Sequence, residues 1–510
     1  MNFKGSPLVI APEELASEGL IVVTVSYRLN VFGFLGFEDD YARGNLGILD
    51  QYMALVWVRE NIKYLGGSPD NITLIGHSSG ASSILVHLTS PRTKNLFQRV
   101  VLMSGSVFSP WLRSRPKTES RPVLTVSRSI ARSLGCYGKN FPVRNSRTSL
   151  VILSCMRKKS KDEILRAFQS AYKNGNWTDI LGPMADDFLP SENQYLPIDP
   201  VLALRQGKFH KVPILAGITT NEGTLTLHKW RDLISGREED IRYFIEKTAI
   251  TDVIDKYNLT FAEVRSLVKW HYFEKNEKSV LHQLVKLYND AMYTAPFIEQ
   301  LRVLSGHASP SLPIFVYHFT YATSEYLGNV GQMLNLSEAS HGAELSFLFG
   351  PSLFQKVSGR RFTTGEERLS LKMKRLWASF IRTGNPNPAP YALSVWEKFS
   401  LREPNYLKMF VDGNTGENLK KLTGNLNSEA DSLWNVLLPT IGNLTRERER
   451  KWERPLVYTG GTSLDSSGTC TSYKNAMFTI LAFSIILLFI LLLSLLLLKK
   501  RTKERDRNIL

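Results

Sequence analysis

The sequence is poor in cysteine, and the cysteines it has are not arranged as in a metal site. Its 510 residues include only three, Cys136, Cys155 and Cys470, with no histidines nearby, so no zinc-binding pattern is present. Cys136 and Cys155 are separated by 19 residues, which is short enough for a local disulfide loop. Cys470 is compatible with a free thiol, an acylated thiol or a disulfide between chains.

Acidic residues are scarce in two segments, and these segments carry the whole net charge of +16. Residues 112–161 hold 13 Lys and Arg against one acid, Glu119, and residues 499–510 hold six against Glu504 and Asp506. A basic segment of this kind can bind nucleic acid or anionic lipid. Few aromatic residues interleave with these charges and no nucleic-acid-binding motif is present, so we interpret residues 112–161 as a solvated insertion.

The sequence also lacks a recognisable signal peptide, since Met1–Ser6 leads directly into ordinary sequence. Long apolar runs are absent except for residues 476–498, which contain no charge and are long enough to span a bilayer. Six basic residues follow this run, which predicts a single transmembrane helix with a cytoplasmic C-terminus. We therefore expect a plasma-membrane protein whose main domain is extracellular, with tail anchoring of a cytosolic domain as the alternative.

This topology divides the chain into four predicted parts. They are a folded domain (1–440), a stalk rich in charged, Gly, Ser and Thr residues (441–475), the transmembrane helix (476–498) and a basic tail (499–510). Asn-x-Ser/Thr triplets that agree with an extracellular domain, and are candidate glycosylation sites, begin at Asn176, Asn258, Asn335 and Asn443.

The folded domain alternates predicted strands with predicted helices. Short apolar runs rich in β-branched residues predict strands at Leu20–Val25, Ile72–Ile75, Val100–Met103, Pro213–Ala216 and Ile314–His318. Helical spacing of apolar residues predicts helices at Met53–Ile62 and from Ala81 to Leu88. This alternation predicts an α/β domain with a mostly parallel sheet covered on both faces.

The motif that carries the most chemical information is Gly76-His77-Ser78-Ser79-Gly80. It follows an apolar strand and opens a helix, which is the context of the G-x-S-x-G nucleophile elbow of the α/β-hydrolase fold. The turn is tight, so we expect glycines to flank the serine where side chains would clash. Ser78 is therefore the candidate nucleophile.

A serine nucleophile needs a general base and a carboxylate that orients the base. In this fold the three residues follow in the order serine, acid, histidine. Glu222 lies in Asn221-Glu222-Gly223 just after a predicted strand, and His341 lies in a Gly-containing loop further on. Spacing alone leaves other acids and histidines in competition for both roles.

From Leu20 to about Trp434 the chain resembles the type-B carboxylesterase/cholinesterase family. The matching stretches occur in the order of that family: SYRLNVFGFL (26–35), GNLGILDQYMALVWVRENI (44–62), NITLIGHSSGASS (71–83), VVLMSGS (100–106), NEGT (221–224), SHGAELSFLFG (340–350) and LWASFIRTGNPNP (376–388). The resemblance implies carboxylic ester hydrolysis through a serine acyl-enzyme without metal or organic cofactor.

The resemblance also assigns roles to individual residues. The family's nucleophile, acid and base correspond to Ser78, Glu222 and His341. Its backbone oxyanion donor after the nucleophile corresponds to Ser79. Two further implied features are a disulfide between Cys136 and Cys155 and a substrate pocket at His77 and Trp111.

Three departures from the family pattern affect this expectation. The Gly-rich segment that supplies most of the family's oxyanion hole precedes the point where this sequence starts. One missing upstream piece also explains the missing signal peptide, so we expect that the sequence is truncated. The alternative is a real loss of this segment, which would leave the protein inactive. His77 replaces the family's usual glutamate, which leaves acetylcholine specificity unsupported. Ser79 replaces the usual alanine and retains the backbone N–H.

A different class of function remains open. Neuroligin-like adhesion proteins place this fold on a single-pass anchor and bind partners on other cells, and they commonly lose a member of the triad. Here Ser78, Glu222 and His341 are all present, which favours the enzyme. The predicted partners are thus a small ester and a membrane, with a homodimer or a cell-surface partner as further options and nucleic acid excluded.

Overall fold

The computed structural model describes the chain in ten stretches: 12–110, 122–138, 148–174, 181–226, 237–274, 279–307, 309, 312–321, 338–387 and 396–453. The chain divides into two compact units, Met1–Arg446 and Glu447–Leu510. The sheet and the candidate site both lie in the first unit.

The centre of the first unit is a six-stranded sheet in the order β1-β2-β3-β4-β5-β6. Neighbouring strands from β1 to β5 run parallel, and β6 is antiparallel to β5. The parallel strands therefore end at one common edge, where loops can bring side chains together. The strands are β1 (Thr73–His77), β2 (Arg99–Met103), β3 (Ile214–Thr219), β4 (Ile314–Phe319), β5 (Asn405–Met409) and β6 (Leu419–Thr423).

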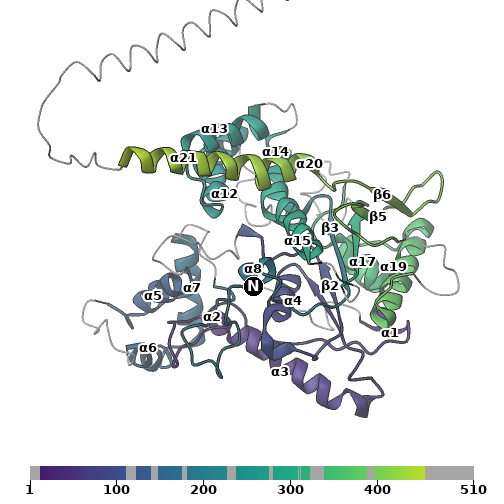
Figure 1. Cartoon of the computed structure of the whole chain (residues 1–510), viewed down its shortest axis with the longest axis horizontal. Coiled ribbons are helices and arrows are strands. Elements are labelled where there is room, and N and C mark those ends of the chain that lie inside the picture. The colour runs from purple at the N-terminus through teal and green to yellow at the C-terminus, as the bar shows by residue number, and fades with distance from the viewer. Residues whose placement is uncertain are drawn as a thin grey trace, which may run out of the picture. The chain divides into compact units, whose positions relative to one another are not determined.

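Alternating residues of the central strands enter two different cores. Val100, Leu102 and Ile214 pack into a cluster with residues of helix α4 (Ser79–Thr89), whereas Val101 and Leu215 pack into a second cluster with helix α19 (Thr364–Thr383). Figure 1 shows α4 and α19 on opposite sides of the sheet. This period of two explains why the strands read as continuous apolar runs, and it confirms the predicted α/β domain with a mostly parallel sheet.

Most of the other described residues are helical. The longer helices are α3 (Leu46–Asn61), α5 (Pro122–Ser133), α6 (Thr148–Met156), α7 (Lys161–Asn174), α13 (Ala262–Lys269), α14 (Val280–Asn289), α15 (Ala295–Gly306), α18 (Gly350–Ser358) and α21 (Leu438–Glu453). The shorter ones are α1 (Glu13–Ala16), α2 (Asn30–Phe34), α8 (Pro200–Arg205), α11 (Glu238–Phe244), α12 (Ile250–Lys256), α17 (Ala343–Leu348) and α20 (Ser428–Asp431).

Tighter and wider turns of helix join several of these segments. The 3₁₀ turns are η1 (Ile62–Leu65), η2 (Pro91–Thr93) and η4 (Glu222–Thr224), and the π-helical turns are η5 (Ile245–Ala249), η6 (Trp270–Glu274), η7 (Asp290–Thr294) and η9 (Ser432–Leu437). Helices α11 to α14, with η5 to η7, η9 and the start of α21, contribute to a third hydrophobic cluster.

The predicted strand at Leu20–Val25 is wrong. This segment has no strand assignment in the structure, although Leu20 and Val22 pack against the cluster that contains α19. Ile21 and Val23 are 49% and 43% exposed. A short apolar run rich in β-branched residues predicts an extended backbone, but a strand also needs a neighbour that pairs with its N–H and C=O groups, and the described residues provide none.

The two predicted helices differ in how well the burial of their side chains follows the prediction. In α4 the expected apolar residues Ala81, Ile84, Leu85 and Leu88 are all buried. Helix α3 starts at Leu46, seven residues before the predicted start at Met53. Trp57, an apolar residue within the predicted helix, is 51% exposed.

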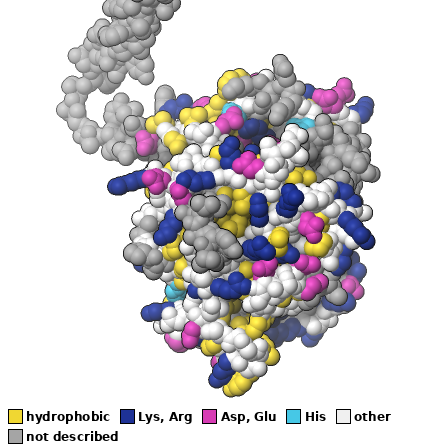
Figure 2. Space-filling model, turned by 90° about the vertical axis from the view of Figure 1, so that its right-hand side faces the viewer, with side chains coloured by type: hydrophobic (Ala, Val, Ile, Leu, Met, Phe, Trp, Pro, Cys, Tyr) yellow, Lys and Arg dark blue, Asp and Glu magenta, His cyan; other side chains and the backbone are white. Residues whose placement is uncertain are grey.

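The basic segment is stapled by the expected disulfide. Cys136 and Cys155 are bonded, with 5.6 Å between their Cα atoms, which joins the end of the α5 region to α6. Described basic residues of this segment, including Arg128, Arg157 and Lys158, are exposed. Figure 2 shows the side of the molecule that lies on the right in Figure 1, where Lys and Arg side chains are scattered among Asp and Glu side chains.

The membrane-related predictions lie largely outside the described ranges. Residues 476–498, Cys470 and the tail 499–510 are among the residues not described. Within the described stretches, no helix combines the length and apolarity needed to cross a bilayer. Helix α21 continues across residue 440, where we expected the folded domain to end, and buries Thr445.

Candidate active site

Ser78 occupies a sharp turn between β1 and α4. Its backbone has φ 56° and ψ −122°, a conformation that costs a non-glycine residue about 1–3 kcal/mol. The Ser78 N–H donates to the carbonyl oxygen of Met103 at 2.7 Å, which ties the turn to the end of β2. The strand, the strained serine and the helix together form the predicted nucleophile elbow.

The glycines around the turn do not share one role. A Cβ on Gly76 would lie 2.5 Å from the Gly80 carbonyl carbon, as expected for a tight turn. Gly105, which follows β2, is more restrictive, because its Cβ would lie 2.1 Å from the Ser78 carbonyl oxygen. The prediction that a side chain would clash at Gly80 is wrong, since a Cβ at this position would meet nothing within 4 Å.

These contacts predict opposite effects of two matched substitutions. Gly105→Ala destabilises the protein by about 1–3 kcal/mol, because the methyl group displaces the backbone of the elbow. Gly80→Ala adds the same methyl group to α4 and is neutral or stabilising by up to about 1 kcal/mol. Denaturant unfolding of both variants measures the difference. Equal midpoints would show that the elbow tolerates a side chain at Gly105.

Glu222 is completely buried in η4, just after β3. Its Oε1 accepts hydrogen bonds from the Ser104 hydroxyl and the Thr219 N–H, both at 2.6 Å. The Glu222 N–H donates to Oδ1 of Asn289 at 2.8 Å, which fixes the turn against α14. Donors therefore hold one carboxylate oxygen in place and leave the other for a further partner.

That partner is His341. Nδ1 of His341 is hydrogen-bonded to Oε2 of Glu222, and the His341 N–H donates to the Thr224 hydroxyl at 3.2 Å. A parallel bridge between Asn221 and Ser340 brings the two loops side by side. Burial lowers the pKa of His341, but the adjacent Glu222 and the charge of Glu344 outweigh it, so that this pKa lies above its ordinary value.

His77 places the elbow directly against His341. The two imidazole rings are 4.6 Å apart between centroids and inclined by 43°. On another side, the Tyr293 ring lies 5.3 Å from the His341 ring. The structure thus brings together the elbow, His341 and Glu222 from three separate parts of the sequence. An imidazole held by a buried carboxylate next to a strained serine can act as a general base.

Two buried residues of this site did not stand out in the sequence. Ser104, just after β2, donates to Glu222, and its Oγ also lies 3.2 Å from Oε1 of Glu344. Glu344, at the start of α17, is completely buried. Their position just after a strand and three residues after His341 was an available signal, because this is where catalytic loops meet.

The other predicted site residues lie as follows. Ser79 is the first residue of α4, so that its N–H points from the helix N-terminus, where anionic groups are favoured. Trp111, Asn176 and Asn335 lie outside the described residues. Asn258 and Asn443 are exposed, and the Asn443 Oδ1 accepts from Arg446 at 3.0 Å.

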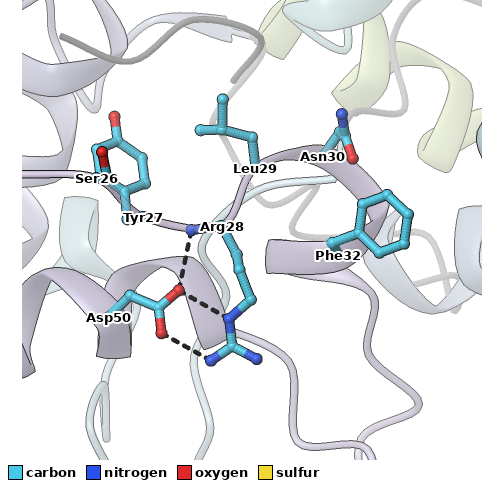
Figure 3. A pocket seen from close by; sticks show the side chains of 7 residues that line it. All are labelled: Ser26, Tyr27, Arg28, Leu29, Asn30, Phe32 and Asp50. Carbon is cyan, nitrogen blue, oxygen red and sulfur yellow. Dashed lines mark hydrogen bonds and ion pairs between the residues drawn. The ribbon is translucent and has the colours of Figure 1, made fainter. Parts of the chain in front are cut away.

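A cavity of about 600 Å³ is lined by none of the site residues described above. Its lining consists of Ser26, Tyr27, Arg28, Leu29, Asn30, Phe32 and Asp50. Figure 3 shows Arg28 turned toward Asp50 and forming three hydrogen bonds with it. The hydrogen-bonded Arg28 holds the pKa of Asp50 below its ordinary value. This pair attaches the extended segment before α2 to α3, and we assign it a structural role.

In the described stretches, no group of three or more His, Cys, Asp or Glu side chains is placed to hold a metal ion.

Comparison with known proteins decides the family. The carboxylesterase family matches residues 1–432. The chain belongs to the carboxylesterase family. This confirms the resemblance seen in the sequence and the α/β-hydrolase fold that it implies.

Curated relatives cover most of the chain. Carboxylesterase 5A of Felis catus is 29% identical over 448 residues, which cover 86% of this chain and 72% of that protein. Acetylcholinesterase of Bungarus fasciatus is 28% identical over 448 residues, covering 86% and 68% of the two chains. Liver carboxylesterase 1 of Mus musculus is 29% identical over 428 residues, covering 82% and 69%. Family members therefore include both carboxylesterases and cholinesterases.

Proposed function

We propose that this carboxylesterase-family chain hydrolyses carboxylic esters, with Ser78 as nucleophile, His341 as general base and Glu222 as the orienting carboxylate. The observation that carries this proposal is the hydrogen bond of His341 Nδ1 to buried Glu222, directly beside the elbow that bears Ser78. Relatives named as carboxylesterases support the same chemistry.

The proposed reaction proceeds in two steps, acylation of Ser78 and hydrolysis of the acyl-enzyme. His341 accepts the proton of the Ser78 hydroxyl while Oγ attacks the ester carbonyl carbon, and the imidazolium then returns this proton to the departing alkoxide. The acyl group remains on Ser78 as an ester. Water then gives its proton to His341 and attacks the acyl carbon, and the proton passes to Ser78 Oγ as the acid departs. The Ser79 N–H donates to the carbonyl oxygen in both tetrahedral intermediates.

His77 bears on the substrate class. The imidazole stands where the family's usual glutamate would offer a negative charge to a cationic alcohol group. Burial, together with the neighbouring His341, holds the pKa of His77 well below its ordinary value, so that the ring is neutral near pH 7. We therefore propose uncharged esters rather than choline esters as substrates.

Replacing Ser78 by alanine tests this proposal. We expect the full chain to hydrolyse p-nitrophenyl acetate and the Ser78→Ala variant to lose about 10⁶-fold in turnover, because no nucleophile remains. Ser83→Ala is the matched control, since Ser83 lies in the same helix and its hydroxyl donates to the Ser79 carbonyl oxygen at 2.9 Å. Equal turnover by wild type and Ser78→Ala would refute the proposal.

The membrane anchor and the cellular location remain proposals from the sequence. We propose that residues 476–498 span the plasma membrane and that the catalytic domain is extracellular. A homodimer or a cell-surface partner is compatible with this arrangement. Loss of mass after glycosidase treatment of the protein from its own cells tests the extracellular orientation, and an unchanged mass would contradict it.

A further inference from the structure

A second imidazole and a second carboxylate lie behind the candidate base. His77 is the last residue of β1, and Glu344 is the second residue of α17. His77 Nε2 lies 3.9 Å from Glu344 Oε1, while the His77 ring contacts the His341 ring. The side chain of His77 is 21% exposed and that of Glu344 is fully buried. The reaction steps above do not use either residue.

The hydrogen bonds around this pair are incomplete. Oε1 of Glu344 lies 3.2 Å from the Ser104 hydroxyl and 3.3 Å from the Tyr317 hydroxyl. A serine hydroxyl has only one hydrogen to donate, and Ser104 lies closer to Glu222, at 2.6 Å. His77 Nε2 and Glu344 Oε2 are both buried without a hydrogen-bond partner in the described part of the chain. Buried polar atoms without partners destabilise the folded state, unless a small shift of the side chains lets them share a proton in a hydrogen bond.

The surrounding charges favour one proton on this pair near neutral pH. Burial and the nearby charge of Glu222 raise the pKa of Glu344 to about 7. Burial and His341 lower the pKa of His77. Three further titratable groups that sense Glu222 are neutral there: burial raises the pKa of Tyr293 and of Tyr317, and it lowers the pKa of His318 to about 4.

We propose that His77 and Glu344 are positioning residues that hold one proton between them, and that release of this proton stabilises the imidazolium form of His341. Below the pH at which this proton is released, the pair has no net charge and His341 interacts mainly with Glu222. Above it, Glu344 becomes a second buried carboxylate near His341. The pair thereby sets the pH at which His341 becomes a free base. An effect of this pair on the reaction rate rests on the proposed ester hydrolysis, whereas its effect on the protonation of His341 does not.

This linkage gives opposite signs for two substitutions. Glu344→Gln removes the second carboxylate, so His341 loses its proton at a pH about one unit lower. His77→Phe keeps a ring beside His341 but removes the nitrogen that shares the proton. Glu344 then ionises at lower pH, and His341 keeps its proton to a higher pH than in wild type. In the double variant the His77 substitution has no further effect, because the charge through which it acts is gone.

The experiment is a pH titration of the full chain with isotopically labelled histidine, followed by nuclear magnetic resonance. His341→Asn assigns the His341 signals, and Glu366→Gln is the control, because Glu366 is equally buried but its carboxylate is bonded to Arg360 and not to the residues of the site. We expect a downward shift for Glu344→Gln, an upward shift for His77→Phe, the Glu344→Gln value for the double variant and no shift for the control. Shifts of the same sign, no shifts, or additive shifts in the double variant would overturn the proposal.

Fluorophosphonate labelling of Ser78 on the same samples separates the two proposals. Labelling with the expected titrations supports both. Labelled Ser78 without the opposite shifts overturns the proton linkage and leaves the esterase intact. The opposite shifts without labelling support the linkage and overturn ester hydrolysis.

Discussion

Replacing Glu222 by glutamine lowers the turnover of a simple ester by about four orders of magnitude and leaves KM nearly unchanged. The glutamine fits the same buried space, but its amide can present an N–H where the carboxylate accepts from His341 Nδ1. His341 then adopts the wrong tautomer and its imidazolium loses the adjacent negative charge. Steady-state kinetics with p-nitrophenyl acetate measure the loss.

Glu366→Gln is the matched control for this change. Glu366 is also completely buried, but its oxygens bind Arg360 and the start of α19, so its replacement has no direct effect on the reaction. We expect the turnover of this variant to remain within about threefold of wild type, as for a substitution that touches no reacting group. A loss of less than tenfold for Glu222→Gln would show that Glu222 does not orient the base.

Removing the disulfide has the largest expected effect on stability. The bond between Cys136 and Cys155 closes a loop with a sequence separation of 19, and Cys136 belongs to the cluster that packs against the sheet. Replacing both cysteines by serine restores the freedom of this loop in the unfolded chain and lowers the free energy of unfolding by about 3 kcal/mol. Denaturant unfolding under non-reducing conditions measures this loss.

The third cysteine provides the control for the disulfide prediction. Cys470→Ser changes the same residue type outside the described residues and is expected to leave the unfolding midpoint of the domain unchanged. An equal midpoint for wild type and the double serine variant would mean that native contacts alone order this segment.

The sequence predicts the elbow and its two partners because their signals are local or ordered along the chain. Gly76 to Gly80 combines a turn motif with a strand before it and a helix after it, and the structure shows all three. Glu222 and His341 were candidates through their order and the family resemblance. Their hydrogen bond depends on the bridge between Asn221 and Ser340, which joins residues far apart in sequence.

Other features depend on neighbours that no local pattern specifies. Leu20–Val25 has the composition of a strand, but pairing requires another strand beside it. Ser104 and Glu344 look like ordinary polar residues until the sheet places both beside Glu222. The same holds for Asn289, whose side chain accepts from the Glu222 N–H across a separation of 67 residues. Contacts between residues far apart in the sequence therefore determine the residues that surround Glu222.

The most direct test of the central claim is covalent labelling of Ser78 in the native protein. Cells that express the chain are treated with a fluorophosphonate probe, and mass spectrometry identifies the modified peptide. We predict a label on Ser78 that is lost in Ser78→Ala and strongly reduced in His341→Ala, since the base activates the hydroxyl. An unlabelled Ser78 in correctly folded protein would contradict ester hydrolysis and favour the adhesion alternative.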